Sequence, residues 1–137
     1  MKTKQRWLAT RVLRDPANPE IELEAQLGLP EPTKGGDFRC AFRVKGLDRG
    51  KTVYAGGIDA LQALVNALDG LATKLRESGR ALMWIDIAGE TGIRRQVPIF
   101  LGVDLANEIE SHIEATIEAV IQSKKGATAP APPHEPR

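Results

Sequence analysis

The fold is decided by the stretch Asp59-Ala-Leu-Gln-Ala-Leu-Val-Asn-Ala-Leu-Asp-Gly-Leu-Ala-Thr-Lys-Leu-Arg-Glu-Ser-Gly79, in which apolar residues recur with the period of an α-helix. At about 100° per residue, these apolar residues fall within an arc of roughly 120°, and polar residues occupy the opposite side. The stretch predicts one long amphipathic helix whose apolar stripe needs a covering surface. That stripe consists of Leu61, Leu64, Val65, Leu68, Leu71, Ala72 and Leu75.

Both ends of this stretch carry residues that are typical of helix boundaries. The carboxylate of Asp59 can accept from the first free N–H groups, and Gln62 can reach back in a capping box. Gly79 can adopt the left-handed conformation that ends a helix. We therefore expect the helix to begin near Ala60 and to stop at Gly79.

Two segments before this helix alternate between apolar and polar residues, as strands with one buried face do. Residues 20–27 carry glutamates and a glutamine on the polar side, whereas residues 38–45 carry Arg39, Arg43 and Lys45 there. If the two strands pair antiparallel, these opposite charges face each other, which is mildly favourable. The apolar sides consist of Ile21, Leu23, Ala25 and Leu27 in the first segment and of Phe38, Cys40, Phe42 and Val44 in the second.

Further strand-forming segments lie at residues 7–14, 51–55 and 82–87. The buried face of the first is ambiguous, because apolar residues occur on both of its sides. Strand residues resume at Ile93, where the nearby Pro98 predicts a sheet edge.

A second helix follows, with Asp104 as its predicted cap. Its apolar side is formed by Leu105, Ile109, Ile113, Ile117 and Val120, with Ala106 and Ile121 at the margin.

Together these segments predict a two-layer α+β fold, in which an antiparallel sheet of about four to six strands packs on the long helix and a C-terminal helix follows. We expect a single domain over residues 1–123. Residues 124–137 lack periodicity and large apolar side chains, so they predict a flexible Pro/Ala-rich tail.

Composition excludes several classes of protein. One cysteine and two histidines among 137 residues rule out an internal disulfide and provide too few ligands for a structural zinc site. A net charge of +1 does not supply the positive field that nucleic-acid binders use. The chain shows no signal-peptide core and no membrane span, so we expect a cytoplasmic protein without a nucleic-acid or membrane partner.

Three pieces of the sequence resemble a family of small, mostly bacterial proteins that carry a domain of unknown function. They are Cys40-Ala-Phe-Arg-Val-Lys-Gly-Leu47, Ala55-Gly-Gly-Ile-Asp-Ala-Leu-Gln-Ala-Leu64 and Leu82-Met-Trp84. The resemblance covers roughly residues 7–100 and implies one compact bacterial cytosolic domain. It implies no activity, cofactor or site residue.

Most of the conspicuous polar residues have a structural explanation in capping, cross-strand pairing or solubility. Cys40 lies on the apolar side of its strand and is predicted to be a buried core thiol. The pattern therefore favours a non-enzymatic protein-interaction or accessory module, with no catalytic, cofactor-binding or metal-binding residue. Its partner is an unidentified protein or a second copy, and a homodimer through the C-terminal helix is favoured over a monomer.

In an alternative hypothesis, the protein binds a small molecule or an anion, either as a binding protein or as an enzyme. Its site would use Arg39, Arg43 and the glycine loops at residues 35–36 and 56–57, and it predicts a concave pocket where these groups converge.

Overall fold

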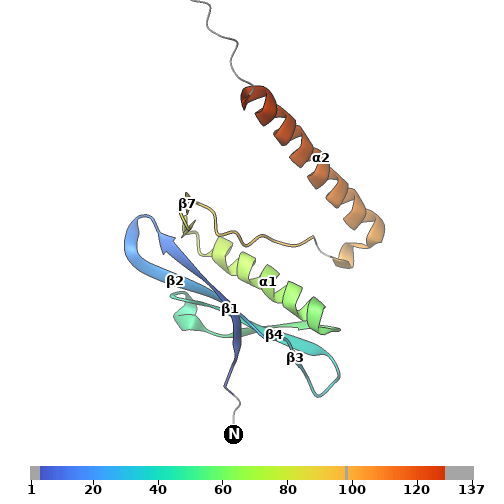
Figure 1. Cartoon of the computed structure of the whole chain (residues 1–137). Coiled ribbons are helices and arrows are strands. Elements are labelled where there is room, and N and C mark those ends of the chain that lie inside the picture. The colour runs from blue at the N-terminus through green and yellow to red at the C-terminus, as the bar shows by residue number, and fades with distance from the viewer. Residues whose placement is uncertain (1–3, 98, 129–137) are drawn as a thin grey trace, which may run out of the picture. The chain divides into compact units, whose positions relative to one another are not determined.

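The computed structural model describes residues 4–97 and 99–128 of the chain (Figure 1). The chain divides into two compact units between Gln96 and Val97. The first unit contains the sheet and helix α1, Ala60–Glu77, and the second contains helix α2, Val103–Thr128. Short 3-10 turns lie at Asp48–Gly50 and Ile99–Leu101.

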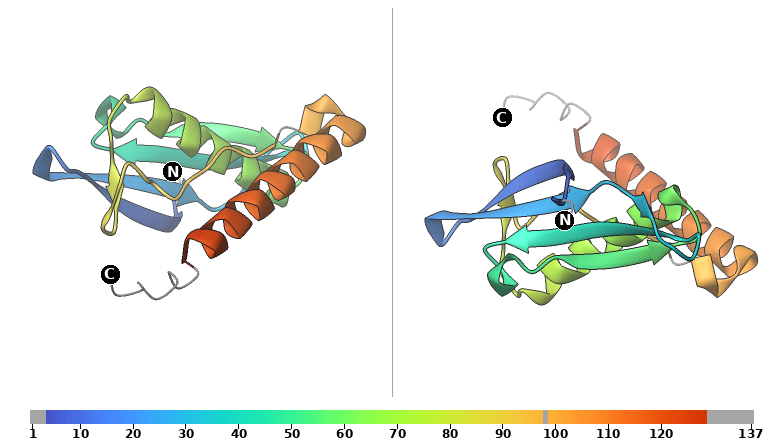
Figure 2. Two further views of the ribbon diagram at one scale, coloured as in Figure 1. Left: turned by 90° about the horizontal axis from the view of Figure 1, so that it is seen from above. Right: turned by 90° about the horizontal axis from the view of Figure 1, so that it is seen from below.

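Seven antiparallel strands form the described sheet, in the order β3-β4-β2-β1-β6-β7, and β5 also pairs with β4. Helix α1 lies on one face of it, and the strands are in front of α1 in the view from below (Figure 2). The predicted α+β class is confirmed, and the strand number exceeds four to six because three strands have only two residues each. The strands are β1 (Trp7–Asp15), β2 (Asn18–Gly28), β3 (Glu31–Pro32), β4 (Phe38–Lys45), β5 (Val53–Gly57), β6 (Met83–Trp84) and β7 (Ile87–Ala88).

The alternation predicted for β2 and β4 is present, and the two strands pair antiparallel with Glu24 opposite Lys45 and Gln26 opposite Arg43. Lys45 Nζ lies 3.4 Å from Glu24 Oε2, so the expected cross-strand charge pairing is confirmed there. Leu23, Ala25, Leu27, Cys40, Phe42 and Val44 are buried toward α1.

Two residues of these strands depart from the prediction. Ile21 is exposed, because the start of β2 extends beyond the core cluster. Ala41 is buried although it lies on the opposite face, where an added methyl at Gly28 would be only 3.1 Å from its Cβ.

Helix α1 begins and ends where the sequence predicts. Asp59 is the N-cap and accepts from the backbone N–H of Gln62 at 2.8 Å, while the Gln62 side chain accepts from the N–H of Ile58. Gly79 follows the C-cap Ser78 and has a φ of 68°, the left-handed conformation expected of it.

The buried stripe of α1 is rotated relative to the predicted one. Ala63 and Ala67 are fully buried, whereas Leu61 is exposed. The cause is close packing: an added methyl at Gly57 would lie 2.3 Å from the backbone nitrogen of Ala63. Small residues therefore face the sheet at the start of the helix, and the larger Leu71 and Leu75 are buried further along it.

The strand predicted over residues 82–87 is wrong, because Met83–Trp84 and Ile87–Ala88 form a short hairpin instead. The chain reverses at Ile85, whose φ of 54° breaks an extended run. Ile93 packs against the core without belonging to a strand. The expectation for Pro98 lies outside the described residues.

Helix α2 starts one residue before the predicted cap, so Asp104 lies in its first turn, where a negative charge is favourable. The helix continues to Thr128 and thus includes the start of the predicted tail, 124–137; residues 129–137 lie outside the described ones. The single domain over residues 1–123 stays a prediction.

Candidate functional site

Arg39 lies on the face of β4 turned away from α1, here called the outer face, and is held by two neighbours. Its Nε donates to Glu31 Oε1 at 2.7 Å, across the pairing of β3 with β4. Its guanidinium carbon lies 4.3 Å from the ring centroid of Tyr54, a distance typical of cation–π contact.

Arg43 lies on the same face and has separate neighbours. Its Nε donates to Gln26 Oε1 at 2.6 Å, and its guanidinium carbon lies 4.3 Å from the ring centroid of Trp7. Four residues along a strand correspond to about 13 Å, so Arg39 and Arg43 occupy two distinct stacks. Ligand binding by this pair stays a prediction.

The glycines of the predicted loops have backbone roles. Gly36 has a φ of 91° in the turn before β4, and its N–H donates to the carbonyl of Thr33 at 3.1 Å. Gly57 permits the close approach of α1 described above, and the carbonyl of Gly56 accepts from Asn66 at 2.8 Å. Turn formation and packing account for both loops.

Cys40 is fully buried, as predicted. Burial, with a smaller contribution from the negative charge of Glu31, raises the pKa of the Cys40 thiol above its ordinary value. Its Sγ donates to the backbone carbonyl of Gly28 at 3.2 Å. A protonated, enclosed thiol is a core residue rather than a nucleophile.

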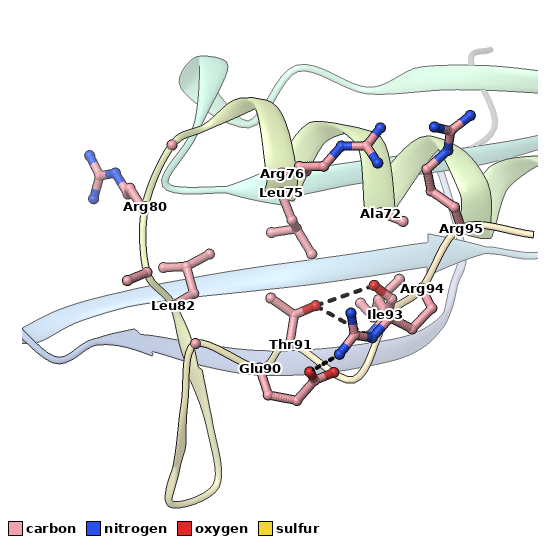
Figure 3. Close-up of a pocket in the computed structure, with 13 residues that line it drawn as sticks. Ala72, Leu75, Arg76, Arg80, Leu82, Glu90, Thr91, Ile93, Arg94 and Arg95 are labelled. Carbon is pink, nitrogen blue, oxygen red and sulfur yellow. Dashed lines mark hydrogen bonds and ion pairs between the residues drawn. The ribbon is translucent and has the colours of Figure 1, made fainter. Parts of the chain in front are cut away.

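A cleft of about 690 Å³ lies between the C-terminal end of α1 and residues 89–95, and we call it the arginine cleft (Figure 3). Four arginines line it, two from the α1 end and two from the later segment. Figure 3 shows Arg94 beside Glu90, with Leu75 and Leu82 on the inner side of the cleft. The four are Arg76, Arg80, Arg94 and Arg95.

Three carboxylates lie near these arginines, at unequal range. Arg94 forms an ion pair with Glu90. Arg80 Nη1 lies 3.9 Å from Asp15 Oδ2 and Arg95 Nε lies 3.9 Å from Asp69 Oδ1, so these two ion pairs are too long for hydrogen bonds. Four arginines thus face three carboxylates. The electrostatic balance at the cleft is therefore positive.

The segment that carries Arg94 and Arg95 is pinned to β1. Arg11 Nη1 donates to the carbonyl of Thr91 at 3.2 Å, and the Arg11 guanidinium lies 3.9 Å from the ring centroid of Trp84. Gly92 passes beside this stack with a φ of 72°, where an added methyl would lie 2.6 Å from Arg11 Nη1. Trp84 thus packs at the core margin.

Sequence reasoning missed the arginine cleft. The periodic and alternating patterns assign no role to Arg76 or to the Arg94–Arg95 doublet. The only signal was the count of arginines on either side of the 82–87 segment. Because that segment was taken for a straight strand, the reversal that brings the two pairs around one cleft was not visible.

Helix α2 presents an apolar stripe that is far more exposed than that of α1. Leu71 and Leu75 of α1 are 2% and 3% exposed. The corresponding large residues of α2 are between 41% and 52% exposed, while Ile109 is half-buried. These exposed residues are Leu105, Ile113, Ile117, Val120 and Ile121.

The described residues contain neither a cluster of metal ligands nor a membrane-spanning helix. No group of three or more His, Cys, Asp or Glu side chains there is arranged to hold a metal ion. None of the helices in that part of the chain has the length and apolar character needed to cross a membrane.

Residues 9–95 match the family described as a domain of unknown function (DUF6968). The chain belongs to this family. The resemblance inferred from the sequence is thereby confirmed. Comparison with curated proteins gave no match, and neither did comparison with solved structures.

The DUF6968 match includes the whole of α1 and all four arginines of the arginine cleft. It ends at Arg95, eight residues before α2 begins at Val103. The cleft thus belongs to the DUF6968 part of the chain, and the apolar stripe of α2 lies outside it.

Proposed function

We propose that this DUF6968 protein is a non-enzymatic protein-interaction module that pairs with a second copy of itself through α2. The observation that supports this proposal is the exposed apolar stripe of the helix. Five large aliphatic side chains in water cost free energy that a partner surface removes. Contiguous exposed apolar residues are typical of protein–protein contact sites.

The stripe has the geometry of a helix-pairing seam. Leu105, Ile109, Ile113 and Ile117 follow one another at intervals of four residues, and Val120 continues the row. Side chains at these intervals share one helix face. From Leu105 to Val120 the seam extends for about 22 Å, which is enough for two helices to pack side by side.

The charges of α2 favour a second copy in the antiparallel orientation. Acidic residues occupy the first part of the helix, beginning with Asp104 and Glu108, and Lys124 and Lys125 lie near its end. In an antiparallel pair, the acidic start of one helix faces the basic end of the other. A parallel pair would instead place like charges beside each other along its whole length, which is unfavourable. The acidic residues are Asp104, Glu108, Glu110, Glu114 and Glu118.

Sedimentation equilibrium of the full chain over a concentration series tests this proposal. We expect a dimer in the wild type and a monomer in Ile113→Glu, because that change buries a carboxylate at the centre of the seam. The matched control is Ser111→Glu, which adds the same charge about 160° away around the helix and should leave the dimer intact.

Two results would overturn self-pairing through α2. One is a wild type that stays monomeric at the highest concentration. The other is equal loss of the dimer in Ser111→Glu and Ile113→Glu, since this would show a general effect of negative charge.

A further inference from the structure

Two arginines of the arginine cleft have donor groups that the described residues leave uncommitted. The Arg76 guanidinium has no hydrogen bond or ion pair with any described residue. Arg95 has only a long ion pair, with Nε 3.9 Å from Asp69 Oδ1 and no hydrogen bond, and that same oxygen already accepts from the backbone N–H of Gln96 at 3.2 Å.

Both arginines line the cleft, one from α1 and one from the later segment. Asp69, the nearest carboxylate to Arg95, lies seven residues before Arg76 on α1, so both positions share one face of the helix. Side chains of a helix point back toward its N-terminus, which directs Arg76 toward Asp69 and Arg95. Figure 3 shows Arg76 extended along α1 in the direction of Arg95.

The helix macrodipole does not explain this arrangement. Its negative end at Ser78 favours cations in the last turn and so accounts for Arg76. Arg94 and Arg95 come from a different segment, which Arg11 and the turn closed by Thr91 hold in place. Their positive charge is additional to what the helix end attracts.

Below the arginines the cleft has an apolar floor. The floor consists of Ala72, Leu75 and Leu82, which are almost fully buried, and of Ile93, which is part-buried and keeps apolar surface at the cleft. A cleft of about 690 Å³ is within the usual size of small-molecule sites, which combine an apolar lining with a few charged groups. The fitting ligand has an apolar body and one strongly anionic end.

We propose that the arginine cleft binds a small organic phosphate, with its phosphate held by Arg76 and Arg95 and its apolar body on Ile93. A phosphate group offers three acceptor oxygens and about two negative charges to arginine forks that form paired hydrogen bonds. Arg94 stays in its ion pair with Glu90, and its positive charge attracts the phosphate without a direct hydrogen bond. This site is independent of the pairing proposed for α2.

The test uses phenyl phosphate as the probe, titrated into the ¹⁵N-labelled full chain at low ionic strength. We expect saturable shifts of the backbone amide signals at residues 79–82 and 89–95. The double variant Arg76→Gln/Arg95→Gln should raise the Kd by about tenfold or more, because it removes charge-assisted hydrogen bonds. Both residues are exposed, and thermal unfolding of the variant verifies that it is folded.

The matched control is Arg39→Gln/Arg43→Gln, which removes the same charge from the site that the sequence predicted. Its Kd for phenyl phosphate should stay within about twofold of the wild type. Loss of binding in this control, but not in the cleft variant, would overturn the proposal and favour the outer face. Binding that weakens equally in both variants would show only a response to net charge.

Two further probes test whether the cleft recognises the phosphate group, the apolar body or both. Inorganic phosphate should bind more weakly than phenyl phosphate because it leaves the floor uncovered, and benzoate should bind more weakly because it carries a single charge. Benzoate binding as tight as that of phenyl phosphate would overturn the assignment to a phosphate. Repeating the titration with Ile113→Glu should give an unchanged Kd, so failure of the pairing proposal would leave this result intact.

Discussion

At the scale of single residues, Gly57 sets the distance between α1 and the sheet. An added methyl there would lie 2.3 Å from the nitrogen and 2.8 Å from the Cα of Ala63, and backbone atoms cannot move aside as a side-chain tip can. Gly57 ends β5 only two residues before the cap of α1. The first turn of the helix is therefore docked on the strand that precedes it.

We predict that Gly57→Ala lowers the free energy of unfolding by about 1–3 kcal/mol, the usual cost of overpacking. The neighbouring Gly56→Ala is the control, because its added methyl has no contact closer than 4.0 Å. It should leave stability unchanged or raise it, since alanine restricts the unfolded chain more than glycine does. Urea unfolding measures both, and equal midpoints would refute the close packing.

At the scale of elements, two capping hydrogen bonds determine where α1 begins. The Asp59 side chain accepts from the Gln62 N–H at 2.8 Å, and the Gln62 side-chain oxygen accepts from the Ile58 N–H at 2.6 Å. These two bonds satisfy donors that a helix start otherwise leaves without partners.

Asp59→Ala should therefore lower the free energy of unfolding by about 1 kcal/mol. Asp59→Asn keeps an accepting oxygen and loses only the favourable charge at the helix start, so it should recover more than half of that loss. Denaturant unfolding of the two variants provides the measurement. An asparagine variant as unstable as the alanine variant would show that charge, not the capping bond, is what matters.

The elements predicted well from the sequence are those whose signals are local. The spacing of apolar residues within each segment is enough to predict α1, β2 and β4. Asp59 and Gly79 are residue types that are typical of helix ends. The hairpin at β6 and β7 was missed because a left-handed φ such as that of Ile85 is rare for a β-branched residue, so the residue type gives no signal of a reversal there.

The rotation of the α1 stripe has a similar cause. The helical period places the apolar Leu61 in the stripe. At the start of α1, however, the close approach of Gly57 to Ala63 leaves room only for small side chains, and Ala63 and Ala67 are buried there instead. Periodicity gives the apolar face of a helix to within about one residue position, and the packing distance decides which edge of that face is buried.

At the scale of the whole molecule, the sequence named Arg39 and Arg43 because they alternate visibly along one strand. The arginine cleft is assembled from two segments whose proximity depends on the Ile85 reversal and on the contact of Arg11 with Thr91. Such a long-range contact leaves no periodic trace, so sequence patterns alone could not identify the cleft.

The orientation of the α2 pair is testable by charge reversal. In the antiparallel arrangement, Lys124→Glu/Lys125→Glu places carboxylates against Asp104 and Glu108 of the other copy and should weaken the dimer about three- to tenfold. Adding Asp104→Lys/Glu108→Lys to the same chain restores opposite charges and should recover the dimer, although the macrodipole disfavours both changes within each helix.

In a parallel pair, like charges stay beside like charges in every variant. Unchanged dimer dissociation across the series, measured by sedimentation at matched salt with helix content verified by circular dichroism, would therefore exclude the antiparallel arrangement.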